Sequence, residues 1–268
     1  MNNLLRSIKE VVAENRELPF TVYTSIHQQR LLNVPIAKPL LIVVLNGEKE
    51  LGKNNELICH AGSFVFLSDG PAINMRNIPK NNEYFALLIE FEYAELKDLP
   101  IVTAKQKHHY IGATSAELAQ CLQQFVECTH WAPKSLCSAR KREIIDLLCQ
   151  TGHKEILSLL KGSNIAHRLH DIFCESEFTD VTMEHICIQL AMSESTLRRQ
   201  LKAEGSSVQE VKDKARIGLG LHLLQTTRLS IGLIAEKCGY QSQSRFTGRF
   251  KNWFGLTPSE LRKTIMTD

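Results

Sequence analysis

The sequence contains no long apolar segment. Its longest uncharged apolar run is Leu40–Leu45 in a chain of 268 residues, whereas a membrane-spanning helix needs about 18 apolar residues. The N-terminal stretch carries charges among its apolar positions and lacks the apolar core of a secretory signal. These absences exclude a membrane-spanning protein and predict a cytoplasmic location without a membrane partner.

The sequence also has no Cys-x-x-Cys pair. Its 8 cysteines are dispersed, without a paired metal-ligand spacing. In a cytosolic chain of this size such cysteines are typical of small buried apolar side chains. We therefore expect neither a disulfide framework nor a cysteine metal site.

Motifs for catalysis are absent as well. There is no nucleophile elbow, phosphate-binding loop or dinucleotide fingerprint. A metal-dependent cupin enzyme needs a His-x-His pair on one strand, but His27 and His60 are isolated and His108 and His109 are adjacent. We therefore predict no enzyme, no cofactor and no metal, with a cupin-type enzyme as the remote alternative.

Charge is unevenly distributed although the whole chain carries a formal charge of only +3. Residues 1–180 have a net charge of −2, and residues 181–268 have a net charge of +5. A basic excess confined to one end of a chain indicates an anionic partner for that end.

The first part of the chain has the pattern of short strands. Apolar, β-branched runs are separated by turn-rich pieces such as residues 46–55, with no helical period between them. This pattern predicts an antiparallel sandwich or barrel. The predicted strands are residues 20–26, 39–45, 63–68, 73–78 and 84–91.

A helical period begins near Thr114. The sequence from Thr114 to Glu117 has the form of a capping box, with Thr114 as the N-cap. Two connector helices then follow, and we expect them to pair with each other or with a second subunit. Everything beyond Asn164 is predicted to be helical, which gives an α+β chain with a β domain, a helical connector and an all-α domain.

Residues 182–201 have the spacing of a helix-turn-helix. A first apolar face ends at Leu190, Ser193 is the predicted N-cap of the second helix, and Leu197 and Leu201 anchor that helix. The pattern recurs in residues 230–250, with Gly239 in the turn. The anchors are repeated at a separation of 49 and the first helices at 48, so one extra residue is expected in the second turn.

Two capped helices complete this region. Ser207 is the predicted N-cap of a long helix between the two copies, and Thr257 with Pro258 is predicted to begin a short last helix. Two copies of the motif with a capped helix between them are much more specific than a single copy.

The stretch from Ser230 to Lys263, SIGLIAEKCGYQSQSRFTGRFKNWFGLTPSELRK, closely resembles the double helix-turn-helix domain of the AraC/XylS transcription regulators. The resemblance covers about residues 165–266. It implies a cupin-like regulatory β domain in residues 1–112, helical connector and dimerisation helices in 113–163, and a DNA-binding domain in 164–268. It further implies a bacterial transcription regulator, commonly an activator.

The faces of the two second helices indicate which side chains meet DNA. At 100° per residue, Arg199 lies opposite the buried stripe of the first copy, where it can contact a guanine. The same calculation places Gly248 at the centre of the second outward face, where family members often carry arginine. The predicted DNA-binding residues are Ser195, Thr196, Arg198, Arg199, Lys202, Gln243, Ser244, Arg245, Thr247, Arg249 and Lys251.

Double-stranded DNA is therefore the predicted partner, together with RNA polymerase. The β domain is expected to sense a small molecule, to form a homodimer, or both. An alternative hypothesis keeps DNA binding but places it under the control of a regulatory partner protein. The sequence does not identify a ligand-binding residue.

Overall fold

A computed structural model describes residues 1–14, 17–54, 56–68, 70, 72–100, 108–160, 163–176, 178 and 181–265. The N-terminal part is a β-sandwich in which every strand pairing is antiparallel. Its strands are β1 (Thr21–Ser25), β2 (Gln29–Val34), β3 (Leu40–Asn46), β4 (Glu48–Leu51), β5 (Leu57–His60), β6 (Ser63–Leu67), β7 (Ile73–Ile78), β8 (Tyr84–Glu90) and β9 (His109–Ala113).

These strands form two separate sheets. One sheet has the order β1-β8-β3-β6-β9, and the other has the order β2-β7-β4-β5. Of the two predicted architectures, the sandwich is therefore confirmed, and the described strands do not close into a barrel.

The central strands β3 and β8 are apolar up to their last residues, Asn46 and Glu90, because both of their faces are covered. Leu41 and Val43 belong to the core shared with the flanking helices, whereas Ile42 and Val44 belong to the core between the sheets. Strands buried on both faces have continuous apolar runs instead of alternation. This explains why these two strands were the easiest to predict.

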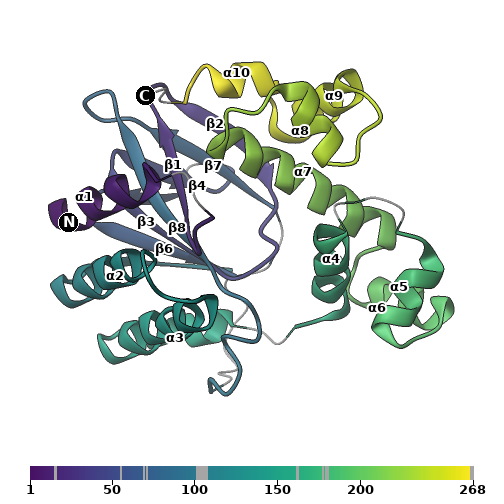
Figure 1. Cartoon of the computed structure of the whole chain (residues 1–268), viewed down its shortest axis with the longest axis horizontal. Helices are drawn as coiled ribbons and strands as arrows, with labels where there is room; N and C mark the ends of the chain where they lie inside the picture. Colours follow the sequence, from purple (N-terminus) through teal and green to yellow (C-terminus); the bar gives the residue numbers. More distant parts are fainter. Residues whose placement is uncertain are drawn as a thin grey trace.

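Helices α1, α2 and α3 lie beside the five-stranded sheet. The helices α4 to α10 lie along the top and the right of the view (Figure 1). No helix in the described part of the chain combines the length and the apolar character needed to span a bilayer. The helices are α1 (Asn2–Val12), α2 (Ala116–Cys128), α3 (Lys134–Gln150), the 3-10 helix η1 (Lys154–Leu159), α4 (Ile165–Glu175), α5 (Met183–Leu190), α6 (Glu194–Ala203), α7 (Val208–Thr226), α8 (Ile231–Lys237), α9 (Gln243–Phe254) and α10 (Pro258–Arg262).

The sequence pattern missed the short strands β2, β4, β5 and β9 and the helix α1. The prediction that residues 46–55 form only a turn-rich piece was wrong, because β4 lies inside that segment. This strand has four residues, and its two buried positions are Lys49 and Leu51. An inward-facing lysine removes the apolar alternation by which a strand is recognised.

The predicted N-cap of α2 was wrong by one residue. Thr114 comes directly after β9 and continues its hydrogen bonding to the neighbouring chain segment, since its backbone N–H donates to the carbonyl oxygen of Gly62 at 2.9 Å. Ser115 is the N-cap, and its hydroxyl accepts from the backbone N–H of Leu118. The strand therefore extends further than the capping pattern indicated.

The connector helices pack within the chain. α2 contacts both α1 and α3, and Leu122, Phe125 and Ile144 are fully buried in the core beneath the sheet. Intrachain packing thus accounts for their apolar faces. All eight cysteines are free; Cys59, Cys128, Cys137 and Cys238 are buried, whereas Cys174 is exposed.

Candidate nucleic-acid interface

The two predicted helix-turn-helix units are present at α5–α6 and α8–α9. Ala191 and Gly239 both have a left-handed backbone after the first helix, with φ of 54° and 71°. Ser193 and Ser242 are the N-caps of the second helices, and each hydroxyl accepts a backbone N–H three residues later. The left-handed residues are 48 positions apart and the caps 49 apart, so the second turn has one extra residue, as predicted.

The predicted anchors are buried. Leu197 and Leu201 of α6, and Phe246 and Phe250 of α9, are each 0% exposed. They hold the second helix of each unit by one face and leave the opposite face in solvent. This is the geometry that places a recognition helix in a major groove.

α6 presents most of its predicted side chains outward. Ser195, Arg198, Arg199 and Lys202 are exposed, and Thr196 is half-buried next to the cap. Arg198 forms an ion pair with Glu194, four residues earlier, at 2.6 Å. Arg199 has no ion-pair or hydrogen-bond partner among the described residues, so its guanidinium is available to a ligand.

α9 presents a different set. Gln243, Ser244 and Arg245 are exposed in its first turn, and Thr247 is half-buried. The Nη1 of Arg245 donates to the side-chain oxygen of Gln241 at 2.8 Å. Lys251 is exposed further along the helix.

Arg249 is held by the protein itself. Its Nη2 lies 2.7 Å from the Asp213 carboxylate on α7, and its guanidinium lies over the Trp253 ring at 6.0 Å. The sequence predicted Arg249 as a DNA-backbone contact. In the structure it connects α9 to the long helix α7.

The two units are joined through α7. Gly220 lies in this helix where a Cβ atom would come within 2.7 Å of the Phe246 ring, so close helix packing explains this glycine. Arg216 lies over the rings of both Phe178 and Tyr240, which brings the segment after α4 against the turn of the second unit.

α9 is also attached to the β-sandwich, which the sequence did not predict. Trp253 donates from its indole Nε1 to the carbonyl oxygen of Asn33 at 2.7 Å, and Asn33 donates from its Nδ2 to the Trp253 carbonyl at 3.2 Å. Asn33 has a left-handed φ of 48° at an irregularity in the register of β2. The same strand therefore pairs with β7 and contacts a predicted recognition helix.

A buried polar chain centred on Gln29 extends this attachment. The Oε1 of Gln29 accepts from Asn77 at 2.8 Å and from Gln225 of α7 at 3.2 Å, and its Nε2 donates to Thr264 at 2.9 Å. Lys49 completes the chain by donating to the Oδ1 of Asn77 at 2.8 Å. Burial lowers the pKa of Lys49 to about 8.

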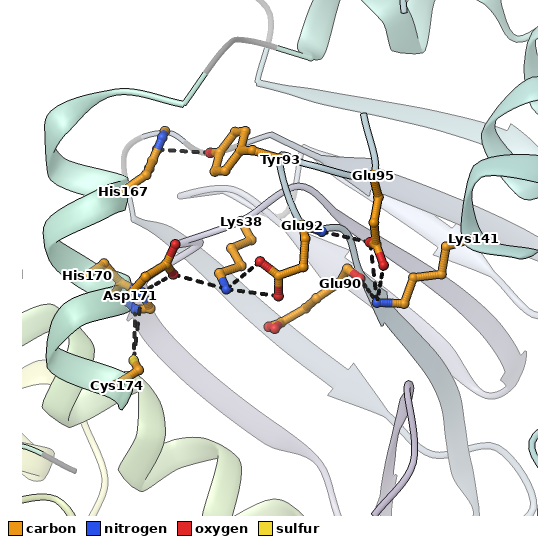
Figure 2. A network of polar contacts seen from close by, with 10 residues as sticks. All are labelled: Lys38, Glu90, Glu92, Tyr93, Glu95, Lys141, His167, His170, Asp171 and Cys174. Carbon is orange, nitrogen blue, oxygen red and sulfur yellow. Dashed lines mark hydrogen bonds and ion pairs between the residues drawn. The ribbon is translucent and has the colours of Figure 1, made fainter. Parts of the chain in front are cut away.

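A second polar junction connects the sandwich to α4 (Figure 2). Lys38, before β3, forms ion pairs with Glu92 at 2.8 Å and with Asp171 of α4 at 3.0 Å. Burial alone would lower the pKa of His170, but hydrogen bonds to Asp171 and Cys174 raise it to about 9. Both partners of this imidazole lie on α4 itself, so the ion pair between Lys38 and Asp171 is the contact that crosses the junction.

Stacking adds a second contact at this junction. The Tyr93 ring lies 4.5 Å from the His167 ring, and the phenol oxygen is 3.0 Å from His167 Nε2 (Figure 2). The sandwich therefore contacts the second helix-turn-helix unit directly through β2. It also contacts α4, which packs against both helices of the first unit.

The described residues contain no group of three or more histidine, cysteine or carboxylate side chains arranged to hold a metal ion. His60 instead lies 2.9 Å from Glu48 on the neighbouring strand.

Known proteins match the C-terminal region of the chain. A family model described as a helix-turn-helix domain matches residues 186–264. The HTH-type transcriptional regulator GadX of Escherichia coli O6:H1 is 35% identical over 82 residues, and an uncharacterised HTH-type transcriptional regulator of Mycobacterium tuberculosis is 37% identical over 83 residues. Each match covers 31% of this chain but only 30% and 23% of the respective relative.

Solved structures match over almost the whole chain. An apo variant of ToxT from Vibrio cholerae aligns with a TM-score of 0.67 and 15% identity over 94% of this chain and 99% of its own. ToxT with an unsaturated fatty acid bound aligns with a TM-score of 0.66 and 15% identity, over 93% of this chain and 97% of its own. At this identity the match shows a shared fold. The duplicated helix-turn-helix, its capped geometry and these relatives together show that residues 186–264 form a helix-turn-helix domain similar to those of HTH-type transcriptional regulators.

Proposed function

We propose that the chain regulates transcription by binding specific DNA sequences with α6 and α9 in successive major grooves. The observation that carries this proposal is the repeated unit, in which each second helix is anchored by buried residues and exposes a polar, basic face. We further propose that it acts in the cytoplasm as an activator that contacts RNA polymerase.

The proposed boundaries are residues 1–112 for the regulatory domain, 113–163 for the connector and 164–268 for the DNA-binding domain. The regulatory domain would sense a small molecule, form a homodimer, or both. Its contacts with α4, α7 and α9 support regulation, because a change in the sandwich has a physical route to both DNA-binding units. ToxT, which shares the fold, has been solved with a fatty acid, so carboxylic acids are suitable first effectors to test.

The alternative is control by a regulatory partner protein. Calorimetric titration with fatty acids and other small metabolites separates the two mechanisms when it is combined with a pull-down from the host lysate. Heat of binding from a small molecule supports sensing, whereas a captured protein without such heat supports partner control.

Arg199→Ala and Lys251→Ala are expected to affect DNA binding in different ways. Arg199 is exposed and free, so its loss should remove a bidentate guanine contact and about 1–3 kcal/mol of binding to a specific site. Lys251→Ala should weaken specific and random DNA alike, because it removes a phosphate contact, and should reduce the salt slope by about one contact.

Fluorescence anisotropy at several salt concentrations, on a selected duplex and a scrambled one, measures both effects. If Arg199→Ala weakened binding to both duplexes equally, Arg199 would not contribute to base recognition. Failure of the wild-type chain to bind its own promoter regions at low salt would overturn the proposed function itself.

A further inference from the structure

Gly248 is a glycine that the fold does not require. It lies inside α9 with an ordinary helical backbone, and a Cβ atom there would meet no atom within 4 Å. Glycine in a helix interior is destabilising relative to alanine, because it loses more conformational freedom on folding. Neither strain nor crowding by the part of the chain that the structure describes therefore explains it.

At other positions of the domain the structure requires a glycine. Gly239 and Gly255 have left-handed backbones, and a Cβ atom at Gly220 would collide with the Phe246 ring. Gly248 differs because the space above it is open solvent on the face predicted to meet DNA. Glycine at such a place allows another molecule to approach the helix backbone closely.

The arginines on the recognition helices divide into two classes. Arg198 is neutralised by Glu194, and Arg249 is neutralised by Asp213. Arg199 has no partner among the described residues, and Arg245 is hydrogen-bonded only to the neutral amide of Gln241. Among these four, Arg199 and Arg245 therefore keep an uncompensated charge for an anionic or electronegative ligand.

Arg245 lies one turn before Gly248 on the same side of α9. Helical side chains lean toward the N-terminus, so a side chain at position 248 would cover the surface beside Ser244 and Arg245. Its absence leaves the Arg245 guanidinium uncovered, and the contact with Gln241 restricts its motion. A pre-positioned guanidinium has the fork geometry that matches guanine O6 and N7.

We infer that α9 reads DNA through Arg245 and that Gly248 allows the helix backbone to lie against the base edges beside it. This inference rests on the proposed function. It assigns one guanine to Arg245 within the site of the second unit.

The test uses the full-length chain and duplexes that the wild-type protein enriches from a random library of about 30 base pairs, a length of about three helical turns. Gly248→Ala should raise or preserve the melting temperature but weaken binding to the enriched duplex by about tenfold or more, which is the loss of one good contact. Gly218→Ala is the matched control. Gly218 is also helical, and a Cβ atom there would meet Pro35 at an ordinary 3.6 Å, so this variant should bind as the wild type does.

Arg245→Ala should weaken binding to the enriched duplex by about 5- to 150-fold and lose the preference for one guanine. Arg245→Lys keeps the charge without the planar fork, so it should retain binding to scrambled DNA and still lose that preference. Repeating the library selection with each variant shows the preference directly.

The outcomes separate the inference from the proposed function. Unchanged or tighter binding by Gly248→Ala, or an Arg245→Lys variant that selects the same guanine as the wild type, would overturn the inference while DNA binding stands. No enrichment of any sequence by the wild-type protein would overturn the proposed function first.

Discussion

Phe250→Ala is expected to lower the free energy of unfolding by about 3–5 kcal/mol, the usual cost of removing a buried aromatic side chain. Phe250 is 0% exposed and lies between Phe246 and Phe254, with ring centroids 5.5 Å and 4.6 Å away. A domain of ordinary stability has only about 5–15 kcal/mol in total. The variant should therefore lose a substantial part of the stability of the domain.

The effect should reach beyond the second helix-turn-helix unit. Phe250 belongs to the same buried cluster as Val34 and Ile42 of the sandwich. Urea denaturation followed by tryptophan fluorescence measures this, with Trp131 replaced by phenylalanine so that Trp253 alone reports the contact with β2.

Asn252→Ala is the matched control, because Asn252 is exposed on the same helix and surface substitutions usually change stability by less than about 0.5 kcal/mol. A loss below about 1 kcal/mol for Phe250→Ala would contradict the buried packing of α9. A Trp253 transition that precedes unfolding of the sandwich would show that the two parts do not unfold together.

The DNA-binding units could be predicted in detail because their signals are local. Ser193, Leu197 and Leu201 lie within nine positions of one another, and the cap and anchor spacing of one unit is repeated in the next. Duplication turns a weak pattern into a specific one. The ion pair of Arg198 with Glu194 is local as well, because a helix brings residues four positions apart together.

The attachment of α9 to the sandwich could not be predicted in this way. Trp253 and Asn33 are separated by 220 positions, and neither residue type indicates the other. The ion pair between Arg249 and Asp213 joins residues 36 positions apart on different helices, so it could not be predicted either. Contacts that depend on how whole elements pack leave no periodic signal in the sequence.

Buried polar residues caused the remaining errors. Lys49 and Gln29 are 2% and 1% exposed, yet both residue types are typical of surfaces. Each occupies an inward position of a short strand, so β2 and β4 lacked the apolar pattern of a half-buried strand. Gln29 has all its hydrogen-bond partners only when α7 and the segment after α10 are in place.

Lys49 should make the stability of the chain depend on pH in the alkaline range. Burial lowers its pKa from 10.5 to about 8, with only a weak opposing effect of Cys59. Because the folded pKa is below the unfolded one, the stability linked to this group is fully present above about pH 10.5 and is lost as the pH falls through 8. The charged amine should therefore cost the folded state about 3 kcal/mol at pH 7.

Lys49→Met removes this dependence. The variant gains by not burying a charge, but it leaves the Asn77 Oδ1 without its donor, at a cost of about 1–3 kcal/mol that does not vary with pH. The difference in unfolding free energy between variant and wild type should thus shift by about 3 kcal/mol in favour of the wild type between about pH 7 and pH 10.5. Urea denaturation at half-unit pH steps measures this difference. Lys251→Met is the control: Lys251 is exposed, so the unfolding free energy of this variant should differ from that of the wild type by a nearly constant amount. A constant difference for Lys49→Met as well would mean that the pKa of Lys49 is the same in the folded and the unfolded chain, which contradicts the desolvation of its amine in the polar chain from Lys49 to Gln29.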